Sequence, residues 1–138
     1  MELAAHITAE DLAVFLQEAS EQLQALDEDI VRLEREKENP DLIQEIFRIA
    51  HTLKGSSAMF GLRLMTVLAH AMENLLDKVR KKTVPVTTQV ADALLHSLDL
   101  LQILKNDLAN STDSQVNIVP VVAELEAAAL TAPDQEGS

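Results

Sequence analysis

The 138-residue sequence contains no cysteine, tryptophan or tyrosine, and it has only three glycines, four prolines and three phenylalanines. The lack of cysteine excludes disulfides and thiolate chemistry, and it agrees with a reducing compartment. The scarcity of glycine and aromatic residues disfavours β-structure, whereas the abundance of leucine and alanine favours helices. The composition therefore indicates an all-α protein.

Positive charge is scarce as well, because 11 Lys and Arg residues face 23 Asp and Glu residues, for a net charge of −12. Such a surface repels a nucleic-acid backbone and an anionic membrane, so we expect neither as a partner. No apolar run approaches the roughly 18 residues of a membrane span. The N-terminus also lacks a basic stretch followed by an apolar one, so we expect no signal peptide and a cytoplasmic location.

Apolar residues recur every three or four positions in five segments, which predicts five amphipathic helices. The first begins after Thr8, where Thr8 and Asp11 resemble a capping box, and ends at the charged run 34–38. The others cover about 40–60, 62–82, 88–110 and 117–130, and Gly61 is a natural stop for the second. The inward residues expected in the first helix are Leu12, Leu16, Ala19, Leu23, Leu26, Ile30 and Leu33. Those expected in the third are Leu64, Met65, Leu68, Ala71, Met72, Leu75, Leu76 and Val79.

Four long amphipathic helices with short connections predict an antiparallel up-down four-helix bundle with a fifth C-terminal helix. Pro120 is acceptable only in the first turn of that fifth helix. We expect residues 1–130 to form one domain, and residues 131–138 to be a disordered tail or the start of an interdomain linker.

His51 is the most informative polar residue of the second helix. It follows the inward Ala50, so it lies about 100° round from the core stripe, on the shoulder of the helix. Phe47, Lys54, Gly55 and Ala58 share this shoulder. The glycine costs about 1 kcal/mol in a helix interior and opens a gap beside the imidazole, while Lys54 can neutralise phosphate oxygens. The same string would also suit a merely solvated histidine.

A polar strip on the third helix contains His70 and Glu73, with Thr66 and Asp77 continuing it. If the second and third helices pack as an antiparallel pair, the strip could face His51. A carboxylate there could then bind one imidazole nitrogen and leave the other as nucleophile. The alternative is that these side chains are solvated. We expect His6 to lie in a flexible tail and His96 to be an ordinary surface residue.

The segment from Ile46 to Gly61, IFRIAHTLKGSSAMFG, resembles the phosphorylation-site helix of histidine phosphotransfer (HPt) domains. The segment from Leu68 to Arg80, LAHAMENLLDKVR, is similar to one branch of that family, the N-terminal phosphotransfer domains of CheA-type chemotaxis kinases. The resemblance of helix number and order extends to about residue 130.

The resemblance implies that His51 is the phosphoacceptor, that Glu73 orients it by holding Nδ1, and that Lys54 supplies charge to the phosphate. It also implies that His70 belongs to the hydrogen-bond network and that Gly55 accommodates the partner. We expect the shoulder to be the docking surface, with Phe47, Ala58, Met59 and Leu62 offering apolar contact. These four residues could instead belong to the core.

The resemblance further implies phosphorylation in trans by a CheA-type kinase ATP-binding domain and transfer to a receiver domain of the CheY or CheB type. We expect no cofactor or metal in this domain, with ATP and Mg²⁺ bound on partner domains. The isolated chain would then be a monomeric phosphoryl carrier without an ATP site, part of a histidine protein kinase.

Three alternatives stay open at this point. A free-standing phosphorelay HPt protein would have the same site and other partners. A metal-binding four-helix bundle of the di-iron type would use Glu-x-x-His pairs with further inward glutamates. Here there is one pair, His70 and Glu73, in the opposite order His-x-x-Glu, and the inner stripes are apolar. In a purely structural interaction bundle the cluster around His51 would be incidental.

Overall fold

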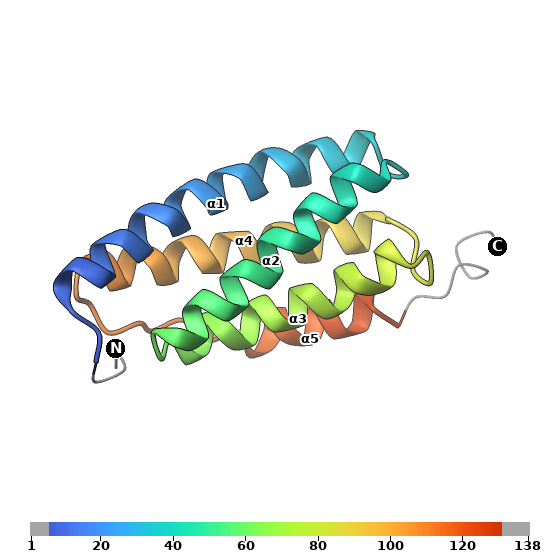
Figure 1. The fold of residues 1–138 in the computed structure, drawn as a ribbon. Coiled ribbons are helices and arrows are strands. Elements are labelled where there is room, and N and C mark those ends of the chain that lie inside the picture. The colour runs from blue at the N-terminus through green and yellow to red at the C-terminus, as the bar shows by residue number, and fades with distance from the viewer. Residues whose placement is uncertain (1–5, 131–138) are drawn as a thin grey trace.

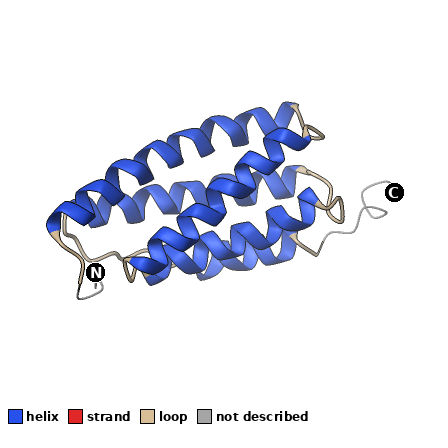
Figure 2. Ribbon diagram, viewed as in Figure 1, coloured by secondary structure: helices blue, strands red, loops and turns tan. Residues whose placement is uncertain are grey.

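The computed structural model describes residues 6–130, which form five α-helices and contain no strand (Figures 1 and 2). The helices are α1 (Ala9–Arg35), α2 (Pro40–Met59), α3 (Arg63–Arg80), α4 (Thr88–Ala109) and α5 (Val119–Ala128). Each predicted helix is present, with ends within about two residues of those expected. The predicted tail at 131–138 lies outside the described residues.

Consecutive helices run in opposite directions along a shared axis, as Figure 1 shows. α2 packs mainly against α3, and α1 lies against α2 and α4. α5 covers the seam between α3 and α4. The predicted antiparallel up-down four-helix bundle with a fifth C-terminal helix is therefore confirmed. None of the helices within residues 6–130 combines the length and the apolar character that crossing a bilayer requires.

The core is formed by the inner stripes of the helices, with Leu and Met side chains that are almost fully buried. Two details of the predicted stripes are wrong. Phe15 is buried, whereas Leu12 and Leu16 are only partly so, because Phe15 turns inward to pack against Phe60 at a centroid distance of 4.7 Å. Leu64 is exposed, because it lies one position off the stripe that Met65 and Leu68 define.

The helix ends follow the capping signals of the sequence. Thr8 and Asp11 form the expected reciprocal capping box at the start of α1. Gly61 ends the α2 region with a φ of 74°, a left-handed conformation that favours glycine.

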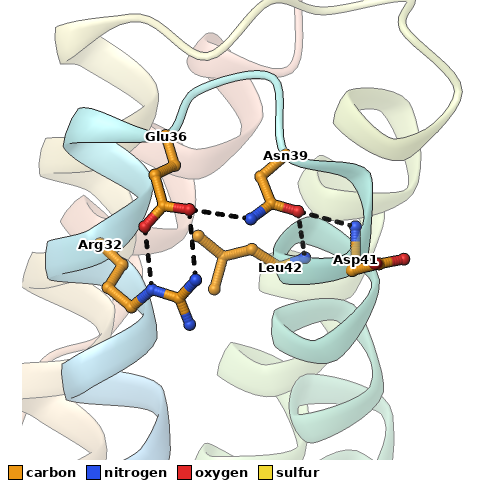
Figure 3. A network of polar contacts seen from close by, with 5 residues as sticks. All are labelled: Arg32, Glu36, Asn39, Asp41 and Leu42. Atoms are coloured by element: carbon orange, nitrogen blue, oxygen red, sulfur yellow. Dashed lines mark hydrogen bonds and ion pairs between the residues drawn. The ribbon is translucent and has the colours of Figure 1, made fainter.

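Asn39 caps α2 and ties it to the end of α1 (Figure 3). Its Oδ1 accepts from the backbone N–H groups of Asp41 and Leu42 at 3.1 and 3.2 Å, and its Nδ2 donates to Glu36 at 2.9 Å. Glu36 in turn accepts two hydrogen bonds from Arg32. The cap thus fixes the turn between α1 and the start of α2, the helix that bears His51.

Replacing Asn39 with alanine should lower the free energy of unfolding by about 1 kcal/mol, because two backbone N–H groups lose their acceptor. Urea denaturation followed by circular dichroism measures the change. Asn39→Ser is the matched control, since serine keeps a capping oxygen and should cost only a few tenths of a kcal/mol. Equal losses in the two variants would show that the cap contributes nothing.

Asp29 is the charged residue of α1 that is buried against α2, with 6% of its surface exposed. Its Oδ2 is buried and has no hydrogen-bond partner among the described residues. Burial, together with the hydrogen bond and the charge of Glu45, raises the pKa of Asp29 to about 7, while Arg32 acts in the opposite direction. Asp29 therefore carries a proton in the folded state at mildly acidic pH.

The raised pKa of Asp29 predicts a pH-dependent stability. The unfolded carboxyl ionises near its ordinary pKa of 3.8, but the folded one does so near 7, so stability should fall between these values as pH rises. Asp29→Asn should lose this slope and be more stable than wild type above pH 7, on the order of 2 kcal/mol or more. Urea melts at pH 4.5, 6 and 8 test this. Glu45→Gln should give a smaller gain in the same direction, and parallel curves for Asp29→Asn and wild type would contradict the prediction.

Candidate functional site

His51 and Glu73 meet where α2 and α3 pack side by side. Nδ1 of His51 contacts Oε2 of Glu73, and Nζ of Lys54 donates to Oε1 of the same carboxylate at 2.6 Å. The antiparallel pairing of the two helices brings the predicted shoulder of α2 against the predicted polar strip of α3. The structure thus places His51, Lys54 and Glu73 in one cluster.

The two members of the His51–Glu73 pair differ in their access to solvent. The side chain of His51 is 61% exposed, whereas Glu73 is buried and Lys54 is half-buried. Burial alone would raise the pKa of Glu73, but the hydrogen bonds and charges of Lys54 and His51 outweigh it and hold that pKa below its ordinary value. Glu73 is therefore an ionised, fixed carboxylate behind an exposed imidazole.

This geometry selects one tautomer of His51. An ionised carboxylate can only accept hydrogen bonds, so Nδ1 of His51 must carry the proton that Glu73 accepts. In the neutral ring Nε2 then has a free lone pair. Because Nδ1 is tied to α3 and the ring is largely exposed, Nε2 is available as a nucleophile to a partner.

Gly55 leaves open space one turn from His51. It is exposed, and a Cβ atom built there would meet no atom within 4 Å apart from its helix neighbours. The helix therefore does not need glycine for its own packing. The gap lowers the side-chain layer beside the imidazole, as the sequence predicted.

Phe47 and Arg80 extend the cluster along the α2–α3 seam. The ring of Phe47 stacks on that of His51, with centroids 6.3 Å apart and an interplanar angle of 14°. The guanidinium of Arg80 lies over the Phe47 ring, with Cζ 4.2 Å from the ring centroid. The sequence alone did not single out Arg80. The antiparallel register that pairs His51 with Glu73 also pairs Phe47 with the end of α3, which is the signal that would have found it.

The apolar residues expected on the docking surface divide into two groups. Ala58 is exposed, Met59 is 70% exposed, and Phe47 is half-buried against the core, so these three can be contacted from outside. Leu62 cannot, because it is only 3% exposed and its side chain belongs to the core at the start of α3. The prediction that Leu62 offers a docking contact is therefore wrong.

The remaining histidines lie outside the cluster. His70 is exposed and forms no hydrogen bond with any described residue, because it lies about 60° round α3 from Glu73, toward solvent. The structure therefore does not place His70 in the network that was expected to include it. His96 is exposed as predicted, but its Nδ1 also bonds Glu124 of α5 at 2.9 Å, which raises the pKa of His96. His6 is exposed just ahead of α1.

The polar strip continues away from His51 in both directions. Thr66 bonds Ser57 of α2 at 2.8 Å between hydroxyl oxygens, and Asp77 pairs with Arg80 and Lys81. The Ser57–Thr66 contact joins α2 to α3, whereas the Asp77 ion pairs connect residues three and four positions apart at the end of α3. Within residues 6–130 no three His, Asp or Glu side chains gather in a way that could hold a metal ion, so the described residues offer no donor set to the metal-binding alternative.

An all-helical bundle that presents an exposed, carboxylate-oriented histidine on one helix has the architecture of a histidine phosphotransfer domain. Comparison with known proteins agrees with this class. The sequence profile of the Hpt domain family matches residues 10–108, so the chain belongs to the Hpt domain family. The curated relatives that it matches include chemotaxis proteins. The chain is 40% identical over 130 residues to the chemotaxis protein CheA of Listeria monocytogenes, which covers 94% of this chain and 21% of that protein.

Solved structures show the same likeness. The CheA phosphotransferase domain from Thermotoga maritima is 34% identical, with a TM-score of 0.71 over 77% of this chain and 99% of that one. The phosphorylated P1 domain of CheA3 from R. sphaeroides, solved in complex with CheY6, shares the fold with a TM-score of 0.79 at 24% identity, over 88% of this chain and 97% of that one. The chain spans about a fifth of the length of the curated CheA relative it matches.

Proposed function

We propose that this chain is the phosphotransfer domain of a CheA-type chemotaxis kinase. It would accept a phosphoryl group from a kinase ATP-binding domain on Nε2 of His51 and pass it to an aspartate of a receiver domain of the CheY or CheB type. The observation that carries the proposal is the contact between the exposed His51 ring and the buried Glu73 carboxylate. The R. sphaeroides P1 domain, which has this fold, was solved phosphorylated and bound to CheY6, which supports the choice of receiver.

The chemistry requires little from this domain beyond a positioned nucleophile. The lone pair of Nε2 forms a bond to the γ-phosphorus of ATP while the bond to the bridging oxygen breaks and ADP leaves. The imidazole ring gains positive charge as this happens. The Glu73 carboxylate at Nδ1 stabilises that charge, in the way that the aspartate of a serine-protease triad stabilises its histidine.

We assign Lys54 the role of meeting the phosphate. Its ammonium is bound to Glu73 in the structure, and it is half-exposed at the edge of the cluster. The side chain has the length to turn one face toward a phosphoryl group on His51 while staying near the carboxylate. ATP and Mg²⁺ would bind on the partner domain, as the resemblance to CheA kinases implies.

Residues 1–130 would then be one phosphotransfer module, with 131–138 leading toward further domains of a kinase. We also propose that the isolated module is monomeric and acts in the cytoplasm. A free-standing phosphorelay protein would use the same site, and phosphotransfer to a panel of receiver domains from the same organism distinguishes the two. Preference for a chemotaxis receiver supports the CheA assignment.

The direct test of the proposed function uses a CheA-type kinase that lacks its own phosphotransfer domain. Incubated with this kinase, ATP and Mg²⁺, the chain should acquire phosphate that is labile in acid and stable in base, as expected of phosphohistidine. Addition of a CheY-type receiver with Mg²⁺ should then discharge it. A chain that stays unlabelled with cognate kinases would refute the proposal and favour the structural interaction bundle.

Gly55 offers a prediction that separates folding from access. Gly55→Ala should raise the free energy of unfolding by about 0.5–1 kcal/mol, because alanine is the better helix former and its Cβ meets open space. Gly55→Trp should also fold, but its side chain should crowd the approach to His51 and slow phosphorylation by the kinase roughly tenfold or more. Phosphorylation by phosphoramidate, a small donor, should be much less affected. Equal rates for the tryptophan and alanine variants with the kinase would show that no partner approaches over Gly55.

A further inference from the structure

A groove of about 480 Å³ opens at the end of the bundle where α2 begins and α3 ends. Its floor is apolar, because Ile43, Val79 and Val84 line it with buried side chains, and Pro85 and Val86 of the α3–α4 connector form one wall. We call it the basic groove, because most of the charged residues that line it are cationic.

Three of the chain's 11 cationic residues line this groove, namely Lys37, Arg80 and Lys82, against a single acidic residue, Glu38. Arg80 is paired with Asp77, but Lys37 and Lys82 form no ion pair with any described residue. The chain as a whole carries a charge of −12. An acidic partner is therefore repelled by most of the surface and attracted here, which orients its approach.

Lys82 occupies a backbone position that favours glycine. It follows the end of α3 with a φ of 64°, in a turn closed by the bonds from Thr83 N–H to the carbonyl of Lys78 and from Lys82 N–H to that of Val79. A side chain in this left-handed conformation costs about 1 kcal/mol relative to glycine. Lys82 lines the groove from this position.

The groove is continuous with the candidate phosphoacceptor site. Arg80 lines the groove and also lies over the Phe47 ring, which in turn stacks on His51. A segment seated in the groove would therefore contact the same seam of α2 and α3 that presents the imidazole.

We propose that the basic groove binds an acidic segment with apolar side chains on the phosphodonor kinase domain, and so holds the donor beside His51. The inference rests on the proposed function, because it assigns a docking surface for the same phosphoryl transfer. The relatives that match this chain are about five times its length and include kinases by name, so donor and groove can share one polypeptide. Lys37 and Lys82, which pair with no acidic side chain among residues 6–130, can attract an acidic segment to the apolar floor. A donor tethered in the same polypeptide would have a high effective concentration at this groove.

The test measures KM and kcat for phosphorylation in trans by a CheA-type kinase that lacks its own phosphotransfer domain. The double variant Lys37→Glu, Lys82→Glu should raise KM for the chain roughly five- to tenfold with kcat little changed, and the rise should shrink at high salt. Its rate with phosphoramidate should equal that of wild type, because His51 and Glu73 are untouched.

Lys82→Gly separates docking from folding. Glycine relieves the left-handed backbone, so this variant should be more stable than wild type and yet raise KM about two- to threefold. Ser111→Gly is the matched control, because Ser111 holds the same kind of position after α4 with a φ of 54° and does not line the groove. It should gain stability with no change in KM.

The outcomes distinguish the two proposals. Unchanged KM in both groove variants, or an equal rise with Ser111→Gly, would overturn the groove while leaving the phosphotransfer function in place. Slower transfer to the receiver with an unchanged KM for the kinase would also overturn it, because the groove would then serve the receiver. A wild-type chain that no cognate kinase phosphorylates would refute the function, and the groove proposal with it.

Discussion

Replacing His51 with glutamine should abolish phosphorylation of the chain by a CheA-type kinase, with no acid-labile phosphate above background. Glutamine has similar polarity but no nucleophilic ring nitrogen, so no phosphoramidate bond can form. The bundle should remain folded, because the His51 side chain is largely exposed and contributes little to the core. Radiolabelled ATP and mass spectrometry of the intact chain measure the loss, and circular dichroism checks the fold.

His96→Gln is the matched control for this loss. His96 is also an exposed helical histidine whose Nδ1 bonds a glutamate, in this case Glu124 on α5. It lies on α4 and lacks a neighbouring lysine–glycine pair, so its substitution should leave the rate of phosphorylation unchanged. Phosphate on the His51→Gln variant, or an equal loss in His96→Gln, would remove His51 from its assigned role.

Replacing Glu73 with alanine should slow phosphorylation on the order of 10²-fold, the scale of a lost positioning and charge-stabilising group. Without the carboxylate, Nδ1 of His51 has no fixed partner, so the ring no longer favours the tautomer with a free Nε2, and the positive charge that develops on it is unsupported. Lys54 also loses its acceptor, but it can reach solvent, so the cost in stability should be about 1–2 kcal/mol.

Two comparisons sharpen the Glu73 prediction. Glu73→Gln should be at least as slow as the alanine variant if its amide donates to Nδ1, because this drives the proton to Nε2 and removes the nucleophilic lone pair. Glu124→Ala removes a carboxylate from the other histidine–glutamate pair and should have no effect on the rate. Unchanged kinetics in Glu73→Ala, or loss of the fold, would contradict a positioning role for Glu73.

Most of the fold was predictable from the sequence because the helices are long, amphipathic and clearly capped. Thr8 and Gly61 begin and end helices at the positions that their capping chemistry predicts. The periodicity predicted the wrong inward residue at two places, where two neighbouring apolar positions could each face the core. Leu64 lies next to the buried Met65, and Phe15 turns inward in place of its neighbours, because the exact rotation of a helix depends on the helices that pack against it.

The candidate site was predictable in part. His51, Lys54 and Glu73 could be grouped because spacing along each helix fixes which residues share a face, and because short connections imply antiparallel neighbours. The outward turn of His70 and the burial of Leu62 depend on the packing of α3, which no local pattern specifies. The contact of Arg80 with Phe47 follows from the same antiparallel register once the two helices are paired, whereas the buried Asp29 carboxyl could be seen only in three dimensions.

The proposed phosphotransfer requires that Nε2 of His51 is the free nucleophile because Glu73 holds the proton at Nδ1. Long-range ¹H–¹⁵N NMR spectra of the imidazole in the phosphorylated, ¹⁵N-labelled chain test this directly, since they identify which ring nitrogen bears phosphorus. We expect phosphorus on Nε2 of His51, with a proton retained on Nδ1 that Glu73→Ala releases to exchange with water. Phosphorus on Nδ1, or on any other residue, would contradict the account.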